Sequence, residues 1–138
     1  MKKVFLDTNI VIDLLTNRKP FIIDVASVFS QAEKNELKLV ISPLTMATTN
    51  YMLSKQLSQS IARRIVREFR LLVEISIMND KVVDLALTDE GFTDFEDGLQ
   101  HYSAIASGCE IIITRDKKDF KNSKLPVMNP GQFLASIR

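Results

Sequence analysis

The chain has 138 residues and a mass of 15.6 kDa, which is the usual size of one domain, and 46% of its residues are hydrophobic. Its 18 Lys and Arg nearly balance its 17 Asp and Glu, so net charge selects no class of partner. One cysteine, Cys109, excludes an internal disulfide and a zinc–thiolate cluster, and one histidine, His101, excludes catalysis by paired histidines. The absence of tryptophan argues against a base-stacking platform.

The first residues carry no pattern typical of a targeting signal. Only three consecutive apolar residues, at positions 4–6, lead up to Asp7, which argues against a signal peptide. No apolar run approaches the roughly 20 residues that a membrane span needs. We therefore expect a cytoplasmic protein without a membrane partner.

Short apolar runs alternate with helical patterns through the first half of the chain. Phe21, Val25 and Val28 recur at helical spacing. Ser42 followed by Pro43 is typical of a helix start. We expect strands at 4–6 and 37–41, and helices at 10–15, 20–35, 43–55 and from 58 or 60 to 72.

The same alternation continues in the second half. Thr93 and Glu96 form a capping-box pattern that predicts a helix to Ser107, and Gly108 is the residue expected at its end. We expect strands at 73–78, 111–114 and 126–128, and helices beginning at 79 or 80, at 93 and at 130, the last reaching 138. Alternating strands and helices predict a three-layer α/β/α fold with a central parallel sheet of about five strands, in one domain over 1–138.

Acidic residues follow two of the predicted strands. Asp7 comes directly after the first strand, Asp116 and Asp119 follow the fourth, and Asp97 lies near the start of the helix before it. Because ligand sites of parallel sheets lie beyond the carboxyl ends of the strands, we expect these acids at one edge of the sheet. Clustered carboxylates require a compensating cation, and ligands that are all oxygen favour Mg²⁺ or Mn²⁺. Such an ion supports hydrolysis of phosphodiesters.

Three segments resemble the PIN domain family: Leu6-Asp7-Thr8-Asn9, Asp94-Phe95-Glu96-Asp97 and Thr114-Arg115-Asp116-Lys117-Lys118-Asp119-Phe120. Their order and spacing match that family over nearly the whole chain. The resemblance implies a PIN-like fold and a ribonuclease that depends on Mg²⁺ or Mn²⁺. Small bacterial members are often toxins of VapBC-type toxin–antitoxin pairs, so the resemblance also implies an RNA substrate, an antitoxin partner and a homodimer.

The resemblance also assigns roles to individual residues. The candidate catalytic residues and metal ligands are Asp7, Asp97 and Asp116, with Asp119 as a further metal ligand. Apart from the resemblance, we expect Thr8, Asn9, Asp94 and Thr114 to support these ligands, because they lie beside the acids in the sequence. We expect Arg115, Lys117 and Lys118 to bind substrate, because these basic side chains adjoin the acidic loop and can steer a polyanion into it.

Several of these residues also have a purely structural interpretation. Asp7 is suited to cap the helix that follows the first strand, and Asp97 is suited to the first turn of its helix. Asp116 is a common turn residue. Arg63, Arg67 and Arg70 share one helical face, a pattern typical of a solvated surface as well as of contact with an RNA backbone.

The chain departs from the family pattern in the helix after the second strand. Many PIN domains have a glutamate there, a few residues beyond a Ser-x-x-Thr start. Here Ser42-Pro43-Leu44-Thr45 is followed by no acid, and Thr48, Thr49 or Asn50 offers only a neutral oxygen. This loss favours one ion over two, and it leaves open a catalytically degenerate module that binds RNA or a protein without cleavage.

A phosphatase of the haloacid dehalogenase type is a third possibility, because that family also has an aspartate after its first strand. It requires a second aspartate two residues later. This chain has Asn9 there, so the leaving group would lack its acid. The sequence therefore favours the nuclease.

Overall fold

Five short parallel strands form the central sheet of the computed structural model, which describes residues 2–34 and 37–137. The strands are β1 (Lys3–Leu6), β2 (Lys38–Ile41), β3 (Glu74–Ile75), β4 (Ile111–Ile113) and β5 (Val127–Met128). Their order across the sheet is β3-β2-β1-β4-β5, and every neighbouring pair is parallel. This arrangement confirms the fold predicted from the alternating pattern.

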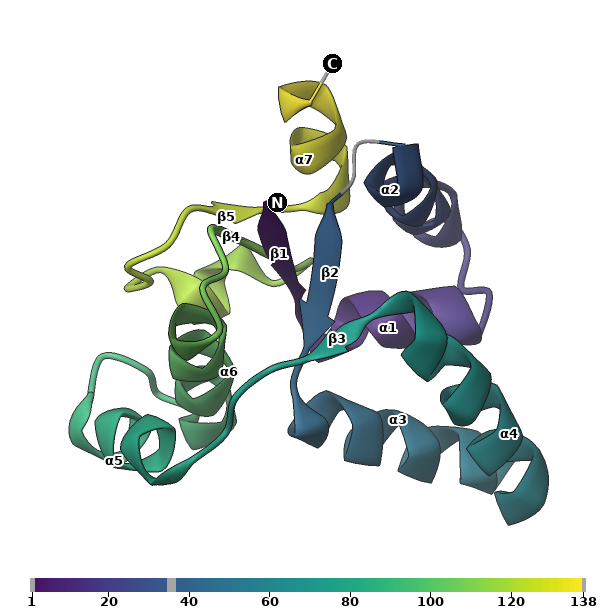
Figure 1. Cartoon of the computed structure of the whole chain (residues 1–138), viewed down its shortest axis with the longest axis horizontal. Helices are drawn as coiled ribbons and strands as arrows, with labels where there is room; N and C mark the ends of the chain where they lie inside the picture. Colours follow the sequence, from purple (N-terminus) through teal and green to yellow (C-terminus); the bar gives the residue numbers. More distant parts are fainter. Residues whose placement is uncertain (1, 35–36, 138) are drawn as a thin grey trace.

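Helices cover both faces of this sheet (Figure 1). They are α1 (Thr8–Leu15), α2 (Ile22–Lys34), α3 (Pro43–Gln56), α4 (Gln59–Phe69), α5 (Asp80–Thr88), α6 (Phe95–Ala106) and α7 (Pro130–Ser136), with 3-10 turns at Arg70–Leu72 and Lys117–Phe120. In Figure 1, α5 and α6 lie on one side of the sheet, and α1 and α2 lie on the other. Beyond the sheet edge, α3 and α4 pack against each other.

Two apolar cores result from the alternation of side chains along the strands. Val4 and Leu6 of β1 pack with α1, α2 and α7 on one face. Phe5, between them, packs on the opposite face with Ile112 of β4 and Ala104 of α6. All of these strand side chains are fully buried, as expected for a parallel sheet covered on both faces.

Several predicted boundaries differ from the observed ones. The helix predicted over 20–35 begins at Ile22, and residue 35 lies outside the described residues, as does residue 138 at the end of the predicted last helix. The strand predicted over 73–78 is paired only at Glu74–Ile75, because the chain turns from β2 toward α6, where the Ile77 N–H donates to the Ser107 hydroxyl at 2.7 Å. Gly108 ends α6 with a positive φ of 76°, as predicted.

The predicted capping box of Thr93 and Glu96 is wrong. Asp94 is the N-cap of α6, and its carboxylate accepts a hydrogen bond of 2.9 Å from the Glu96 N–H. An aspartate one residue closer to the helix therefore takes the capping position. Elsewhere in the fold, none of the helices in residues 2–34 and 37–137 is long and apolar enough to cross a membrane.

Candidate metal-binding cleft

A cleft of about 280 Å³ lies at the carboxyl edge of the sheet. β1 and β4 are neighbours with Leu6 opposite Ile113, so the residues that follow both strands emerge side by side. The start of α6 contributes further residues to the same cleft. Its acidic lining residues are Asp7, Asp94, Glu96, Asp97, Asp116 and Asp119. Three separate segments, of which the first is more than 80 residues from the other two, thus bring their carboxylates to one place, as the strand pattern predicts.

Asp7 is the most enclosed of these acids, with 8% of its surface exposed. It caps α1, since Oδ1 accepts a hydrogen bond of 2.8 Å from the Thr8 N–H. Oδ2 accepts another of 2.8 Å from the Thr114 hydroxyl. Burial raises the pKa of Asp7 above its usual value, although these hydrogen bonds act in the opposite direction. The same side chain therefore caps a helix and lines the cleft.

Asp97 is the acid most affected by its neighbours. Burial raises its pKa to about 7, and the nearby charges of Asp7, Asp94, Asp119 and Glu96 act in the same direction. A carboxyl group in this state is only partly ionised at neutral pH. A bound cation would remove this repulsion, so the electrostatics of the cleft suit a cation.

Asn9 connects the two strand ends. Its amide group donates weak hydrogen bonds to Asp116 Oδ2 at 3.3 Å and to Asp7 Oδ2 at 3.4 Å. Its carbonyl oxygen accepts one of 3.3 Å from the Arg115 N–H. The Thr114 hydroxyl also accepts a hydrogen bond of 3.0 Å from the Asp116 N–H. Asn9 and Thr114 thus hold the Asp7 and Asp116 segments at a fixed distance from each other.

Gln100 was missed by the sequence analysis. It is buried on α6, and its amide group donates to Thr45 Oγ1 at 3.0 Å, to Thr8 Oγ1 at 3.2 Å and, at 3.5 Å, to Asp7 Oδ1. Its carbonyl oxygen accepts a short hydrogen bond from the Ser42 hydroxyl. The signal was its position three residues after Asp97, one helical turn along the same face.

The structure distinguishes among the three side chains that could replace the missing glutamate. Thr48 lines the cleft. Thr49 is buried, and its hydroxyl has no hydrogen-bond partner among the described residues. Asn50 is partly buried and does not line the cleft. The position facing the acids therefore has a hydroxyl group where a carboxylate would add charge.

The basic residues beside the acids have different environments. Arg115 forms an ion pair with the buried Asp13, at 2.6 Å from Nε to Oδ2, and its guanidinium lies 4.1 Å from the centre of the Phe21 ring. It does not line the cleft. Lys117 donates a hydrogen bond of 3.0 Å to Gln132, and Lys118 is exposed. Substrate binding by these three residues stays a prediction.

The chemistry of the cleft fits a divalent cation. Its charged groups are all carboxylates, the ligands preferred by Mg²⁺ and Mn²⁺, and their mutual repulsion helps to raise the pKa of Asp97. Within residues 2–34 and 37–137, however, no three His, Cys, Asp or Glu side chains are grouped closely enough to hold an ion. The cleft thus has carboxylate oxygens suited to a divalent cation, but they do not converge closely enough to coordinate one.

Fold and site together define a three-layer α/β protein with an acidic cleft at the carboxyl edge of a parallel sheet. A family model described as PIN domain matches residues 3–118, and the chain belongs to the PIN domain family.

Individual relatives extend this assignment over nearly the whole chain. The chain is 27% identical to Ribonuclease VapC1 of Aquifex aeolicus (strain VF5) over 136 residues, covering 96% of this chain and 93% of that protein. Among solved structures, VapBC2 from Rickettsia felis bound to a DNA fragment from its promoter has a TM-score of 0.72 at 20% identity, covering 92% of this chain and 98% of the matched one. DNA-bound VapBC from Salmonella typhimurium has a TM-score of 0.73 at 17% identity, and the match covers 94% of this chain and 99% of the matched one. At these identities the structural matches show a shared fold.

Proposed function

We propose that the protein is a metal-dependent endoribonuclease that hydrolyses RNA phosphodiesters. The observation that supports this most directly is the grouping of Asp7, Asp97, Asp116 and Asp119 around one cleft, from three separate parts of the chain. Membership of the PIN domain family and similarity to a relative named Ribonuclease VapC1 support the same activity.

In this proposal Asp7, Asp97 and Asp116 hold Mg²⁺ or Mn²⁺, with Asp119 as a further ligand. When bound, such an ion neutralises phosphate charge and increases the acidity of water. Thr114 and Asn9 orient the carboxylates of Asp7 and Asp116 through the hydrogen bonds described above. Gln100 holds the other oxygen of Asp7 toward α6.

We further propose that the protein is the toxin of a VapBC-type pair. The support is the similarity to Ribonuclease VapC1 and to chains of VapBC complexes. In this role the protein acts in the cytoplasm, forms a homodimer and is inhibited by a cognate antitoxin.

The first test is cleavage of a mixed, structured RNA by the purified protein with Mg²⁺ or Mn²⁺. Asp7→Asn and excess EDTA serve as parallel controls. Cleavage that is lost in both establishes the metal-dependent site. Cleavage that persists in Asp7→Asn means that the nuclease is a contaminant or that the site is elsewhere.

A degenerate module that binds RNA or a protein partner is the second candidate. Its support is Thr48, which faces the acids from α3 where many PIN domains have a glutamate. This candidate predicts that Mn²⁺ still binds, as measured by calorimetry, while no RNA is cleaved. The proposed nuclease predicts binding together with cleavage.

A further inference from the structure

Three arginines of α4 line a groove separate from the acidic cleft. Arg63, Arg64 and Arg67 surround a volume of about 560 Å³ together with Gln59 and Ser60. All five residues are exposed. In the part of the chain that the structure describes, no carboxylate lies within ion-pair distance of these three guanidinium groups. Three positive charges without an ion pair therefore gather at one place in a chain of net charge +1.

This groove differs from the basic face that helical spacing predicts. Arg70 shares that face in the sequence, yet its guanidinium donates a hydrogen bond of 2.9 Å to the Val73 carbonyl. It lines a different hollow, beside Leu71 and Leu72. Arg64 instead joins Arg63 and Arg67. We call this site, with Gln59 and Ser60, the α4 arginine groove.

The acidic cleft lies at the start of α3, whereas the groove lies on α4, which begins just beyond the end of α3. Leu44 and Thr48, near the start of α3, line the cleft. The groove begins at Gln59, just after the end of α3. At 1.5 Å per residue, the 14 residues of α3 span on the order of 20 Å. This length corresponds to about six nucleotides of a stacked helical strand, at roughly 3.4 Å each, and α4 then packs back along α3. Figure 1 shows α3 leading from the sheet edge to α4.

The charge of the cleft makes a second contact useful for an RNA substrate. Several carboxylates line the cleft, so it repels a polyanion until a cation binds there. A cluster of arginines at a distance attracts phosphates whether or not the cleft is neutralised. Arginine is suited to this contact because its planar guanidinium donates two parallel hydrogen bonds to a phosphate.

The lining of the groove favours a nucleic acid over a protein. Every lining residue is polar or positively charged. Stable protein interfaces contain buried apolar or aromatic anchors, whereas nucleic-acid interfaces are polar and strongly basic. Ser60 and Gln59 add neutral donors of the kind that contact phosphate oxygens.

We propose that the α4 arginine groove binds the phosphate backbone of the RNA substrate at a distance from the acidic cleft. The choice of RNA as the ligand rests on the proposed function. A substrate that occupies both sites must extend over several nucleotides.

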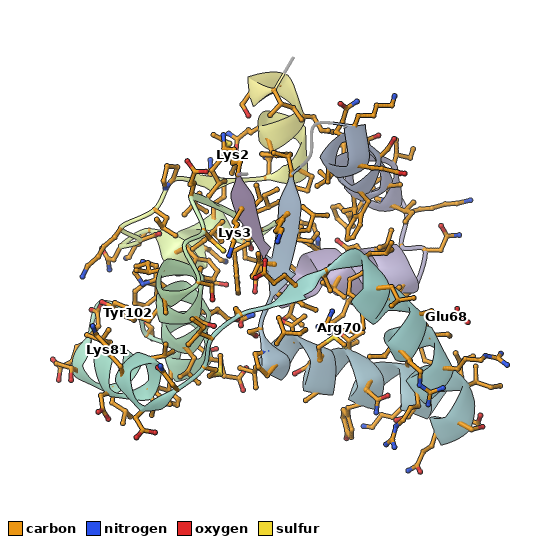
Figure 2. All side chains as sticks on the ribbon, viewed as in Figure 1. Lys2, Lys3, Glu68, Arg70, Lys81 and Tyr102 are labelled. Atoms are coloured by element: carbon orange, nitrogen blue, oxygen red, sulfur yellow. The ribbon has the colours of Figure 1, made fainter. Side chains whose placement is uncertain are left out.

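The test is equilibrium binding of a fluorescent 20-nucleotide single-stranded RNA in EDTA, at 50–200 mM salt. The variant Arg63→Gln/Arg64→Gln/Arg67→Gln is compared with the control Lys2→Gln/Lys34→Gln/Lys81→Gln, which removes the same charge from exposed positions elsewhere. In Figure 2, Lys2 and Lys81 lie well away from Glu68 of α4 and from Arg70, which directly follows α4. Circular dichroism verifies that both variants fold. If the triple arginine variant does not, the three single variants replace it.

We expect the arginine variant to bind the RNA at least about fivefold more weakly at 100 mM salt, and the lysine variant less than about twofold more weakly. The plot of log affinity against log salt has a negative slope. Its steepness should decrease by about 2 in the triple arginine variant, or by about 0.7 in each single variant. Equal losses in the two triple variants, or unchanged RNA binding, overturn the proposal. Unchanged RNA binding with weaker binding of a poly-glutamate peptide would assign the groove to an acidic protein segment instead.

Binding in EDTA requires no cleavage. Absence of nuclease activity with arginine-dependent binding therefore contradicts the proposed function and leaves the groove supported. Nuclease activity with binding that is independent of the arginines contradicts only the groove.

Discussion

The Thr114 hydroxyl donates a 2.8 Å hydrogen bond to Oδ2 of Asp7, across 107 positions of sequence. Both residues are buried, and each directly follows a strand of the neighbouring pair β1 and β4. The bond favours the ionised form of Asp7, which burial disfavours. The neighbouring strand ends thus keep a buried carboxylate closer to the state in which it can bind a cation.

Replacing Thr114 with valine should weaken both stability and metal binding. Valine has the same shape without the hydroxyl, so Asp7 loses a donor and the Asp116 N–H loses its acceptor. Leaving the buried carboxylate and the partly buried N–H without these partners costs about 1–3 kcal/mol, measurable by urea unfolding. Thr114→Ser keeps the hydroxyl and should lose much less. Equal losses in the two variants would mean that the hydrogen bonds of the hydroxyl contribute no more than the packing of the methyl group.

Replacing Asp97 with asparagine should stabilise the protein in EDTA at neutral pH. The substitution removes the charge that burial and the neighbouring acids disfavour, as the raised pKa of about 7 indicates. Because the side chain is partly exposed, we expect a gain of no more than about 1 kcal/mol, or a few degrees in Tm.

The same variant should lose stabilisation by metal. A cation that binds only the folded protein raises the Tm of the wild type. At a free cation concentration a hundred times its Kd, the free energy of unfolding increases by about 2.7 kcal/mol. Thermal unfolding with and without Mn²⁺ measures this difference. A full Mn²⁺ response in Asp97→Asn would remove Asp97 from the set of ligands.

Replacing Thr48 with glutamate should strengthen Mn²⁺ binding. Thr48 already lines the cleft, so a carboxylate there adds a ligand and a charge. We expect about a tenfold lower Kd by calorimetry and faster RNA cleavage. Ala47→Glu adds the same charge at the adjacent exposed position of α3 and controls for bulk electrostatics. If the two variants bind Mn²⁺ equally well, position 48 has no special role.

Breaking the Arg115–Asp13 pair should destabilise the fold. Asp13 is fully buried, so Arg115→Met leaves its charge without a partner, at a cost of about 3–5 kcal/mol. The double variant Asp13→Leu/Arg115→Met removes both charges and should regain most of that loss. Urea unfolding distinguishes the two. The RNA affinity of the folded double variant then tests the predicted substrate contact. If Arg115 contacts RNA, the affinity stays below that of the wild type even though stability is restored.

The sequence was most informative where a side chain's role follows from position in a strand or helix. Asp7 and Asp116 could be placed at one edge of the sheet because they follow buried parallel strands. The N-cap of α6 was misplaced by one residue, since Thr93 and Asp94 are both good capping residues.

Contacts between distant elements were harder to predict. The bonds from Gln100 to Thr45 and Thr8 depend on how α6, α3 and α1 pack, and no local pattern specifies that packing. The same is true of Arg115, whose position beside Asp116 suggested a substrate contact, although its charge is paired with Asp13.

His101 provides a prediction of pH dependence. It is fully buried on α6, between the rings of Phe92 and Tyr102, and burial lowers its pKa to about 4. Asp89 opposes this shift and Lys124 adds to it. The neutral ring fits the structure, because Nε2 accepts a hydrogen bond of 3.0 Å from the Lys124 N–H, which an imidazolium could not do.

Since the pKa of His101 is lower in the folded state than its usual 6.5, folding favours the neutral ring. Its contribution to stability is complete above about pH 6.5 and is lost as the pH falls toward 4, by up to about 3 kcal/mol. His101→Gln should therefore show a shallower fall in the free energy of unfolding over this range. Because the chain has one histidine, its NMR signal titrates without overlap from another imidazole. A midpoint near 4 supports this account, whereas a midpoint between 6 and 7 would show that the ring is accessible to water and does not control acid stability.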